Sequence, residues 1–334
     1  MSFPVRHVTP VTPETATGLV ARVYRQVRDE FSSIGPAVRM LTPADQITAA
    51  AWSLLRESQL AGDAPMLGKV MIALGVAQAN RCDYDVHSYL AMLRIAGAEA
   101  VADEIETRDV PRDPALAEPL TWARATGDHP VPISPLAPAY RAEYLGTALF
   151  THFINRMVAA MLPADLRPGT LRPEDPPPFD GAPVFRPPTT VPAGRSLELL
   201  ETGPRGTVAE WAGDSPVGVA HAALVARTSQ GAGLLTPRAR TAAETVIADH
   251  HGRRPFALPD WEAAMSGLSE PERAGAELAA LAGVAPELIT DARVAAWRAT
   301  DARLSDHCTV YLLSYGAMRA VDHITADLVG ATWE

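Results

Sequence analysis

The chain has 334 residues, of which 47% are hydrophobic, and this length allows a buried core and two domains. A formal net charge of −10 without a basic stripe excludes nucleic acid and anionic membrane surfaces as expected partners. Two cysteines, Cys82 and Cys308, are too few for a disulfide framework, and no segment is apolar enough for a signal peptide or membrane span. We therefore expect a cytoplasmic protein.

Alanine dominates the apolar positions, which favours helices over strands, and the first half of the chain reads as a series of helices. An apolar stripe predicts an amphipathic helix over residues 15–31. Pro43 and Pro65 begin two more helices, and residues 66–80 are apolar on nearly every face, which predicts a central, buried helix. Further helices are expected over residues 82–97, 116–125 and 137–162.

Residues 163–215 are rich in proline and are incompatible with a regular helix or a central strand. We expect an interdomain crossover, and both a segment that wraps over the protein and a disordered one fit this composition. Beyond it, Ser215-Pro216 and Thr236-Pro237 have the pattern of a helix cap followed by a first-turn proline. Later helices are expected to start at Pro259, Ser269 and Thr290, and a last helix to cover residues 304–329.

The second half also contains weak echoes of the first. The segment from Pro114 resembles the segment from Pro271, and Arg156 aligns with Arg319 at an offset of 163 residues. A degenerate tandem duplication would explain both similarities. We therefore predict an all-α fold with a first domain over residues 1–162, the crossover, and a second, related helical domain over residues 216–334.

The densest cluster of groups able to transfer protons lies in residues 77–97. Read as a helix, this stretch sorts them by face: Cys82, Asp85 and Tyr89 on one, Asp83 and His87 on another. A thiol, a carboxylate and a phenol on one face indicate either an active site or a polar core.

The same stretch partly follows the motif Cys-x-x-Cys-x-x-x-His, with an asparagine before it and a glycine after it. The matching positions are Asn80, Cys82, Tyr84 and Gly97. The differences are Asp85 for the second cysteine, Tyr89 for the histidine, and Val70 for a glutamate twelve residues before the first cysteine. This pattern resembles the alkylhydroperoxidase D-like superfamily, which includes carboxymuconolactone decarboxylases.

The resemblance continues in residues 150–162, which look like the Asn-Arg helix that closes the domain in many members. It implies a helical bundle that assembles into a homo-oligomer, a small-molecule substrate and, in the peroxidase members, peroxide chemistry. Three of the four relay residues are changed here, so the implied reaction differs from that of the peroxidases.

Cys82 could be a nucleophile at the start of a helix, where the helix dipole lowers the pKa of a thiol, or a buried structural residue. Asp85, beside apolar residues, could be a general acid or base whose pKa burial raises, or an exposed first-turn residue. Tyr89 lies one turn later and could hydrogen-bond Asp85 or donate to a developing oxyanion.

His87 could act as a base oriented by Asp83, or form an ordinary surface pair with it. Asn155 and Arg156 could hold a substrate carboxylate, although such an arginine can equally tie two helices together. A metal site that combines Asp83, His87 and His152 is not expected, because no metal-ligand spacing is present.

The leading hypothesis is a cofactor-independent enzyme of lyase, decarboxylase or isomerase type. It would act on a small organic acid through Asp85 and Tyr89, with His87 and Cys82 assisting. A thiol peroxidase that depends on Cys82 and an external reductant is the alternative. A catalytically silent scaffold protein is the third.

Overall fold

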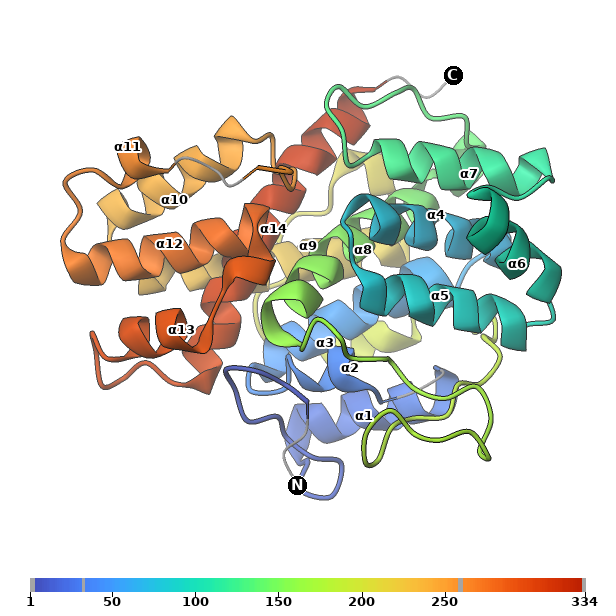
Figure 1. The fold of residues 1–334 in the computed structure, drawn as a ribbon, viewed down its shortest axis with the longest axis horizontal. Helices are drawn as coiled ribbons and strands as arrows, with labels where there is room; N and C mark the ends of the chain where they lie inside the picture. The colour runs from blue at the N-terminus through green and yellow to red at the C-terminus, as the bar shows by residue number, and fades with distance from the viewer. Residues whose placement is uncertain (1–3, 32–33, 258–260, 332–334) are drawn as a thin grey trace.

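The computed structural model describes residues 4–31, 34–257 and 261–331 (Figure 1). Within these ranges the protein is all-α, as predicted, and it contains no strand. β-type pairing in the described residues is limited to two isolated bridges, Ala61 with Val191 and Thr170 with Val184.

The described part of the first half contains eight α-helices, two of which (α2 and α6) add to those predicted from the sequence. Their bounds are α1 Gly18–Glu30, α2 Pro36–Arg39, α3 Asp45–Leu55, α4 Met66–Ala79, α5 Asp83–Ile95, α6 Glu99–Arg108, α7 Pro114–Ala125 and α8 Arg141–Met161. A π-helical turn, Arg56–Leu60, continues α3. Gly97 follows α5 with a φ of +81°, the left-handed conformation expected of a glycine after a helix.

The second half contributes the remaining helices of the described chain. Their bounds are α9 Pro216–Thr228, α10 Pro237–Asp249, α11 Glu262–Met265, α12 Glu270–Val284, α13 Asp291–Arg298 and α14 Asp306–Gly330. The predicted caps of α9 and α10 are confirmed, because Ser215 accepts from the backbone of Gly218 and Thr236 from that of Ala239. The predicted helix start at Pro259 lies outside the described residues.

Helix α4 is the buried centre of the first half, as its uniformly apolar sequence predicts. It packs against α5, α7 and α8 (Figure 1). Gly75 allows α7 to approach closely, because a Cβ atom there would lie 2.5 Å from the carbonyl oxygen of Leu120. Helix α5, which carries the motif residues, therefore packs against a buried apolar helix.

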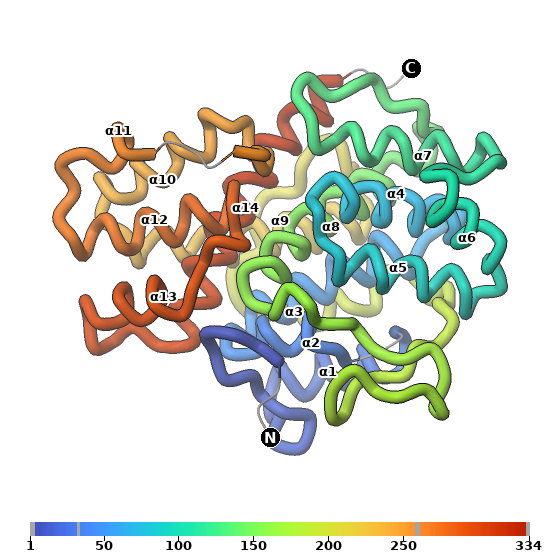
Figure 2. Tube along the Cα trace, viewed as in Figure 1, coloured from blue at the N-terminus to red at the C-terminus, as the bar shows by residue number. Residues whose placement is uncertain are grey.

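The two halves share one hydrophobic cluster, whose buried members extend from Val8 to Leu328. Helix α9 packs on α3, and the long helices α8 and α14 pack against each other. Figure 2 shows α10 to α13 on one side of the molecule, with α14 leading back to the first half. The duplication and the proposed domain boundaries stay predictions.

The crossover packs along the surface of the first half and does not extend away from it. It contains two short 3-10 turns, Arg195–Leu200 and Glu210–Ala212, and is otherwise irregular. Phe185 is buried in a cluster that includes Tyr89 and Leu90 of α5. In Figure 2 this yellow-green segment passes close to α1 and α5.

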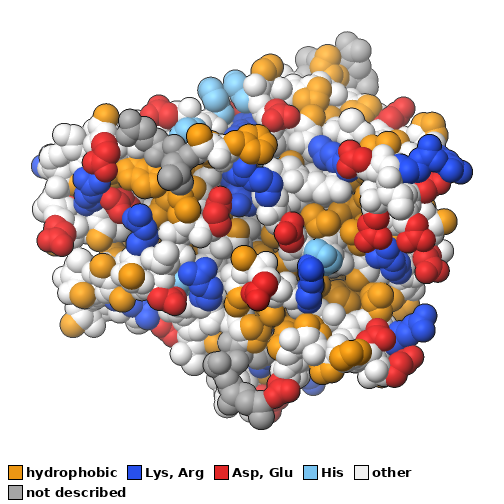
Figure 3. Space-filling model, in the orientation of Figure 1, with side chains coloured by type: hydrophobic (Ala, Val, Ile, Leu, Met, Phe, Trp, Pro, Cys, Tyr) orange, Lys and Arg blue, Asp and Glu red, His pale blue; other side chains and the backbone are white. Residues whose placement is uncertain are grey.

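On the face drawn in Figure 3, basic and acidic side chains alternate without a basic stripe. No helix in the described part of the chain has both the length and the apolarity needed to cross a bilayer.

Gly252 lies in the loop after α10, where a larger residue is expected to destabilise the fold. Its φ is +70°, and a Cβ atom there would lie 2.1 Å from the carbonyl oxygen of Ala320 on α14. We expect Gly252→Ala to lower the free energy of unfolding in urea by about 1–3 kcal/mol, because both the backbone and α14 have to shift.

Gly233→Ala is the matched control, since a Cβ atom at Gly233 would have no neighbour within 4 Å. This variant should stay within about 0.5 kcal/mol of the wild type. Equal effects of the two substitutions would show that the loop is not pressed against α14.

Candidate active site

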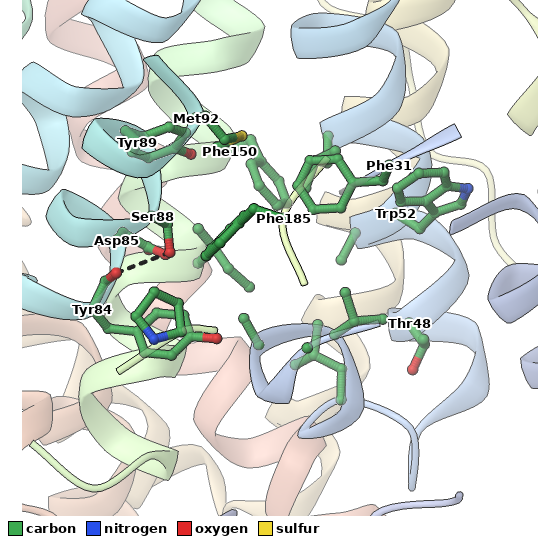
Figure 4. Close-up of a pocket in the computed structure, with 18 residues that line it drawn as sticks. Phe31, Thr48, Trp52, Tyr84, Asp85, Ser88, Tyr89, Met92, Phe150 and Phe185 are labelled. Atoms are coloured by element: carbon green, nitrogen blue, oxygen red, sulfur yellow. Dashed lines mark hydrogen bonds between the residues drawn. The ribbon is translucent and has the colours of Figure 1, made fainter. Parts of the chain in front are cut away.

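A cavity of about 80 Å³ lies between α3, α5, α8, the segment after α1 and the crossover (Figure 4). Its volume is about half that of the ~150 Å³ cavity that accommodates benzene in a well-studied engineered protein. Aromatic rings form much of its wall: Phe31, Trp52, Tyr84, Tyr89, Phe150 and Phe185. Among the described lining residues, Asp85 has the single carboxyl group, and no lysine, arginine or histidine is present.

One of the two carboxyl oxygens of Asp85 takes part in hydrogen bonds. Its Oδ2 atom accepts from Nδ2 of Asn155 at 2.5 Å and lies 3.7 Å from Sγ of Cys82. Among the described residues, no donor lies within hydrogen-bond distance of Oδ1, so this oxygen is the one left for a ligand. Burial raises the pKa of Asp85 to about 6, and the hydrogen bonds from Asn155 and Cys82 oppose this rise.

A chain of buried polar groups extends from Asp85 into the protein. Asn80 uses its Nδ2 amide group twice, donating to Oδ1 of Asn155 at 3.0 Å and to Nδ1 of His152 at 3.1 Å. Nε2 of His152 lies 2.8 Å from Oγ1 of Thr126, whose hydroxyl donates to a backbone carbonyl. Each hydrogen bond in the chain thus joins a donor to an acceptor.

The partners of His152 define its protonation state. Nδ1 accepts from Asn80, so Nε2 carries the proton and donates to Thr126. Burial and the nearby charge of Arg156 lower the pKa of His152 well below its ordinary value. His152 is therefore a neutral anchor for Asn80 and not a metal ligand in this arrangement.

Cys82 is the N-cap residue of α5 and lies behind Asp85, outside the lining of the cavity. Burial and the neighbouring Asp85 raise its pKa well above the ordinary value of a thiol. This is opposite to the lowering predicted from its position at a helix start, because loss of solvent outweighs the helix dipole. Cys308 lies at the start of α14, and the described contacts do not bring the two thiols together.

Tyr89 lies at the cavity wall. The sequence allowed a hydrogen bond between Tyr89 and Asp85, but the structure does not contain one. Its hydroxyl lies 3.4–3.5 Å from the side-chain amide of Gln59, which also approaches Thr151. Burial and the charge of Asp85 raise the pKa of Tyr89, so its phenol remains protonated. Figure 4 shows Tyr89 and Asp85 on the same side of the cavity, both carried by α5.

His87 and Asp83 lie on the exposed face of α5, away from the cavity. Nδ1 of His87 donates to the backbone oxygen of Asp83 at 2.6 Å, not to its carboxylate. Nε2 accepts from Nη1 of Arg167 in the crossover at 2.7 Å. These contacts fasten the crossover to α5 and leave neither residue in reach of the cavity.

Arg156 is fully buried and binds backbone carbonyls rather than facing the cavity. Its guanidinium donates to the carbonyl oxygens of His152, Gly252 and Gly283 at 2.6–2.8 Å. The two sequence-based alternatives for Arg156 were a substrate carboxylate and a tie between helices, and its contacts are those of a tie. Asn155, by contrast, directly contacts Asp85.

Comparison with known proteins adds a relative of full length. Over 341 aligned positions, covering 99% of this chain and 96% of the relative, the sequence is 35% identical to alkyl hydroperoxide reductase Rv2159c of Mycobacterium tuberculosis. The chain belongs to the family of this alkyl hydroperoxide reductase. No protein-family model matches the chain, and no solved structure gives a significant match.

Membership of this family is consistent with the resemblance to alkylhydroperoxidase D-like proteins that residues 77–97 suggested. In this alkyl hydroperoxide reductase-like chain, Asp85 and Tyr89, which replace the second cysteine and the histidine of the motif, both line the cavity. Tyr84, a matching position, also lines it, whereas Cys82 does not. Among the described residues, no cluster of three or more His, Cys, Asp or Glu side chains could hold a metal ion.

Two groups of site residues were not identified from the sequence. Asn80 and His152 were noted, but their role as a buried anchor was not, although His152 and Asn155 share a helix face at a spacing of three. Gln59, which contacts the hydroxyl of Tyr89, and Phe185, which lines the cavity, carry no local signal, because the packing of distant segments brings them there.

The buried carboxyl group of Asp85 generates a pH-dependent stability prediction. Since its pKa is raised from 3.8 to about 6 on folding, the folded state favours the proton, and stability is lost as the pH rises through 6. We expect Asp85→Asn to be more stable than the wild type by up to about 3 kcal/mol at pH 8 and equally stable near pH 4.

Urea unfolding at several pH values measures this difference. Asp83→Asn is the control, because Asp83 lies on the same helix but is exposed, and its curve should follow that of the wild type. A constant difference between Asp85→Asn and wild type across this pH range would contradict the raised pKa.

Proposed function

We propose that the chain is an enzyme in which Asp85 performs acid/base chemistry on a small, uncharged, largely apolar substrate. The observation that carries this proposal is that the cavity has one carboxyl group and otherwise mainly apolar and aromatic walls. A carboxyl group in such a setting is typical of an active site, because burial brings its pKa close to neutral pH. With a pKa of about 6, Asp85 can adopt both protonation states near neutral pH.

The lining favours an uncharged substrate over the organic acid that the sequence analysis expected. An organic anion would bring a second negative charge next to Asp85, and the described lining offers no cation to balance it. A neutral molecule with a polar group near Asp85 would avoid this repulsion. A carbonyl compound with an acidic C–H bond has this chemistry.

The geometry supports a simple proton transfer. Asn155 and Cys82 hold Oδ2, so Oδ1 would take a proton from the carbon next to the carbonyl group, and the bonding pair would move into an enolate. Oδ1 would then return the proton to a different atom of the same substrate. The net reaction is an isomerisation; loss of a leaving group from the enolate would make it a lyase reaction.

A second candidate, hydroperoxide reduction by Cys82, is favoured by the name of the relative and by the contact between the thiol and Asp85. Asp85 would accept the thiol proton, and the sulfur would attack one peroxide oxygen, which breaks the O–O bond. Asp85 would then give the proton to the departing oxygen, so that the products are a sulfenic acid and an alcohol. Two equivalents of an external thiol would then restore Cys82 and release a disulfide and water.

The two candidates predict opposite outcomes for Cys82→Ser. In the acid/base enzyme, Cys82→Ser should retain most activity, whereas Asp85→Asn should lose at least about 100-fold, the range expected for a general base. The assay is deuterium incorporation next to the carbonyl group in a panel of small ketones and aldehydes in D₂O, measured by NMR, with Asp83→Asn as the control.

The peroxidase candidate is tested by consumption of cumene hydroperoxide with dithiothreitol as reductant. Turnover that disappears in Cys82→Ser would establish the second candidate and remove the first. Absence of turnover in this assay, together with exchange that depends on Asp85, would leave the acid/base enzyme.

A further inference from the structure

One loop of the second half reaches the turn that precedes the motif helix. This loop, residues 250–257, follows α10, and the turn is formed by Asn80 and Arg81 between α4 and α5. Nη1 of Arg254 donates a hydrogen bond to the backbone oxygen of Asn80. Arg81 reaches in the opposite direction, and its Nη2 donates to the backbone oxygens of Arg254 and Pro255 at 3.3 and 3.1 Å.

The loop itself is fixed at several points. Nη2 of Arg156 donates to the backbone oxygen of Gly252 at 2.6 Å. Nη2 of Arg254 forms an ion pair with Glu287 at 2.8 Å, and the side chain of Arg254 is only 4% exposed. Gly252 is pressed against Ala320 of α14, as described above. These contacts fix the backbone of the loop and therefore the position of Arg254 next to the turn.

Asn80 is the residue through which this contact can act on the site. It is the C-cap residue of α4, where helix carbonyls lack partners within the helix, so Arg254 supplies the missing donor. The side chain of Asn80 donates to both Asn155 and His152. Asn155 in turn donates to Oδ2 of Asp85.

We propose that Arg254 is a positioning residue for Asp85, acting through Asn80 and Asn155, so that the second half of the chain completes the active site. Arg254 fixes the turn, the turn fixes the amide of Asn80, and this amide keeps Asn155 directed at the carboxylate. The inference rests on the proposed function only in taking Asp85 as the group that is positioned.

The electrostatic surroundings agree with this arrangement. The charge of Arg254 lowers the pKa of Cys82, against the larger effect of burial. Loss of solvent lowers the pKa of Arg254 itself, and Glu287 opposes this. A buried guanidinium with one acidic partner is costly unless its hydrogen bonds are used, and the carbonyl of Asn80 uses one of them.

The experiment measures Asp85 directly and needs no substrate. Infrared spectra of protein labelled with ¹³C-aspartate, taken as differences from Asp85→Asn, give the pKa of this one carboxyl group. Arg254→Met keeps the aliphatic part of the side chain but removes all donors. We expect it to raise the pKa of Asp85 by about 1, because Asn155 would be less well aimed at the carboxylate.

A double-mutant cycle tests the route of the effect. Asn80→Ala should raise the pKa of Asp85 by a similar amount, and Arg254→Met should add little to it in the Asn80→Ala background. Arg254→Lys keeps the charge and one donor, so it should recover only part of the wild-type value. Arg303→Met, which removes an exposed arginine paired with Asp301, is the control and should change nothing.

Three outcomes would overturn the inference. They are a shift in Arg254→Met no larger than in Arg303→Met, an equal shift with and without the Asn80 side chain, and full recovery by Arg254→Lys. The second and third outcomes would mean that Arg254 affects Asp85 only through the electric field of its charge. If Arg254→Met does not fold, the same cycle is measured with Arg254→Lys. A shift in the pKa of Asp85 that disappears in the Asn80→Ala background supports the inference. A shift that persists in that background overturns it.

These results are separable from the proposed function. If no ketone or aldehyde shows exchange that depends on Asp85 but the cycle is non-additive, the reaction is wrong and the positioning stands. If exchange depends on Asp85 but Arg254→Met leaves its pKa unchanged, the reaction stands and the positioning is wrong.

Discussion

The carboxyl group of Asp85 loses nearly all contact with water when the chain folds, and the surrounding structure is arranged to hold it. The pKa of a buried acid rises unless donors stabilise the charged form, and here Asn155 and Cys82 supply only part of that stabilisation. The result is a group that can exist in either protonation state near neutral pH. Such a compromise is costly for stability, and it is typical of a residue retained for chemistry.

The groups that hold Asp85 come from parts of the chain that are far apart in sequence. Helix α5 supplies the acid, α8 supplies Asn155 and His152, and the end of α4 supplies Asn80. The rings of the cavity wall come from α5 itself and from α3, α8, the segment after α1 and the crossover. Because α4 is buried against α5, α7 and α8, the turn at its end holds Asn80 in place for the whole chain of hydrogen bonds.

Much of the local structure could be predicted from the sequence, because its causes are local. The apolar residues of α4, the caps at Ser215 and Thr236, and Gly97 after α5 each determine a helix or its end within a few residues. The direction of the Asp85 pKa shift followed from the apolar residues beside it in the same helix.

The remaining features depend on distant contacts and could not be predicted in this way. The thiol of Cys82 was expected to be acidified by its helix, but helices from elsewhere in the chain exclude water from it and reverse the shift. For Tyr89 the sequence allowed a hydrogen bond to Asp85, yet its hydroxyl lies against Gln59 from the π-helical turn after α3. For Arg156 the sequence allowed two roles, and only the positions of Gly252 and Gly283 distinguish them.

The crossover limits how far the chain can be shortened. Phe185, which lies beyond the first 162 residues, forms part of the cavity wall, and Arg167 contacts His87 of α5. A chain cut after residue 162 would therefore have an open pocket on this side. Truncation at this point would expose the carboxyl group of Asp85 to bulk solvent.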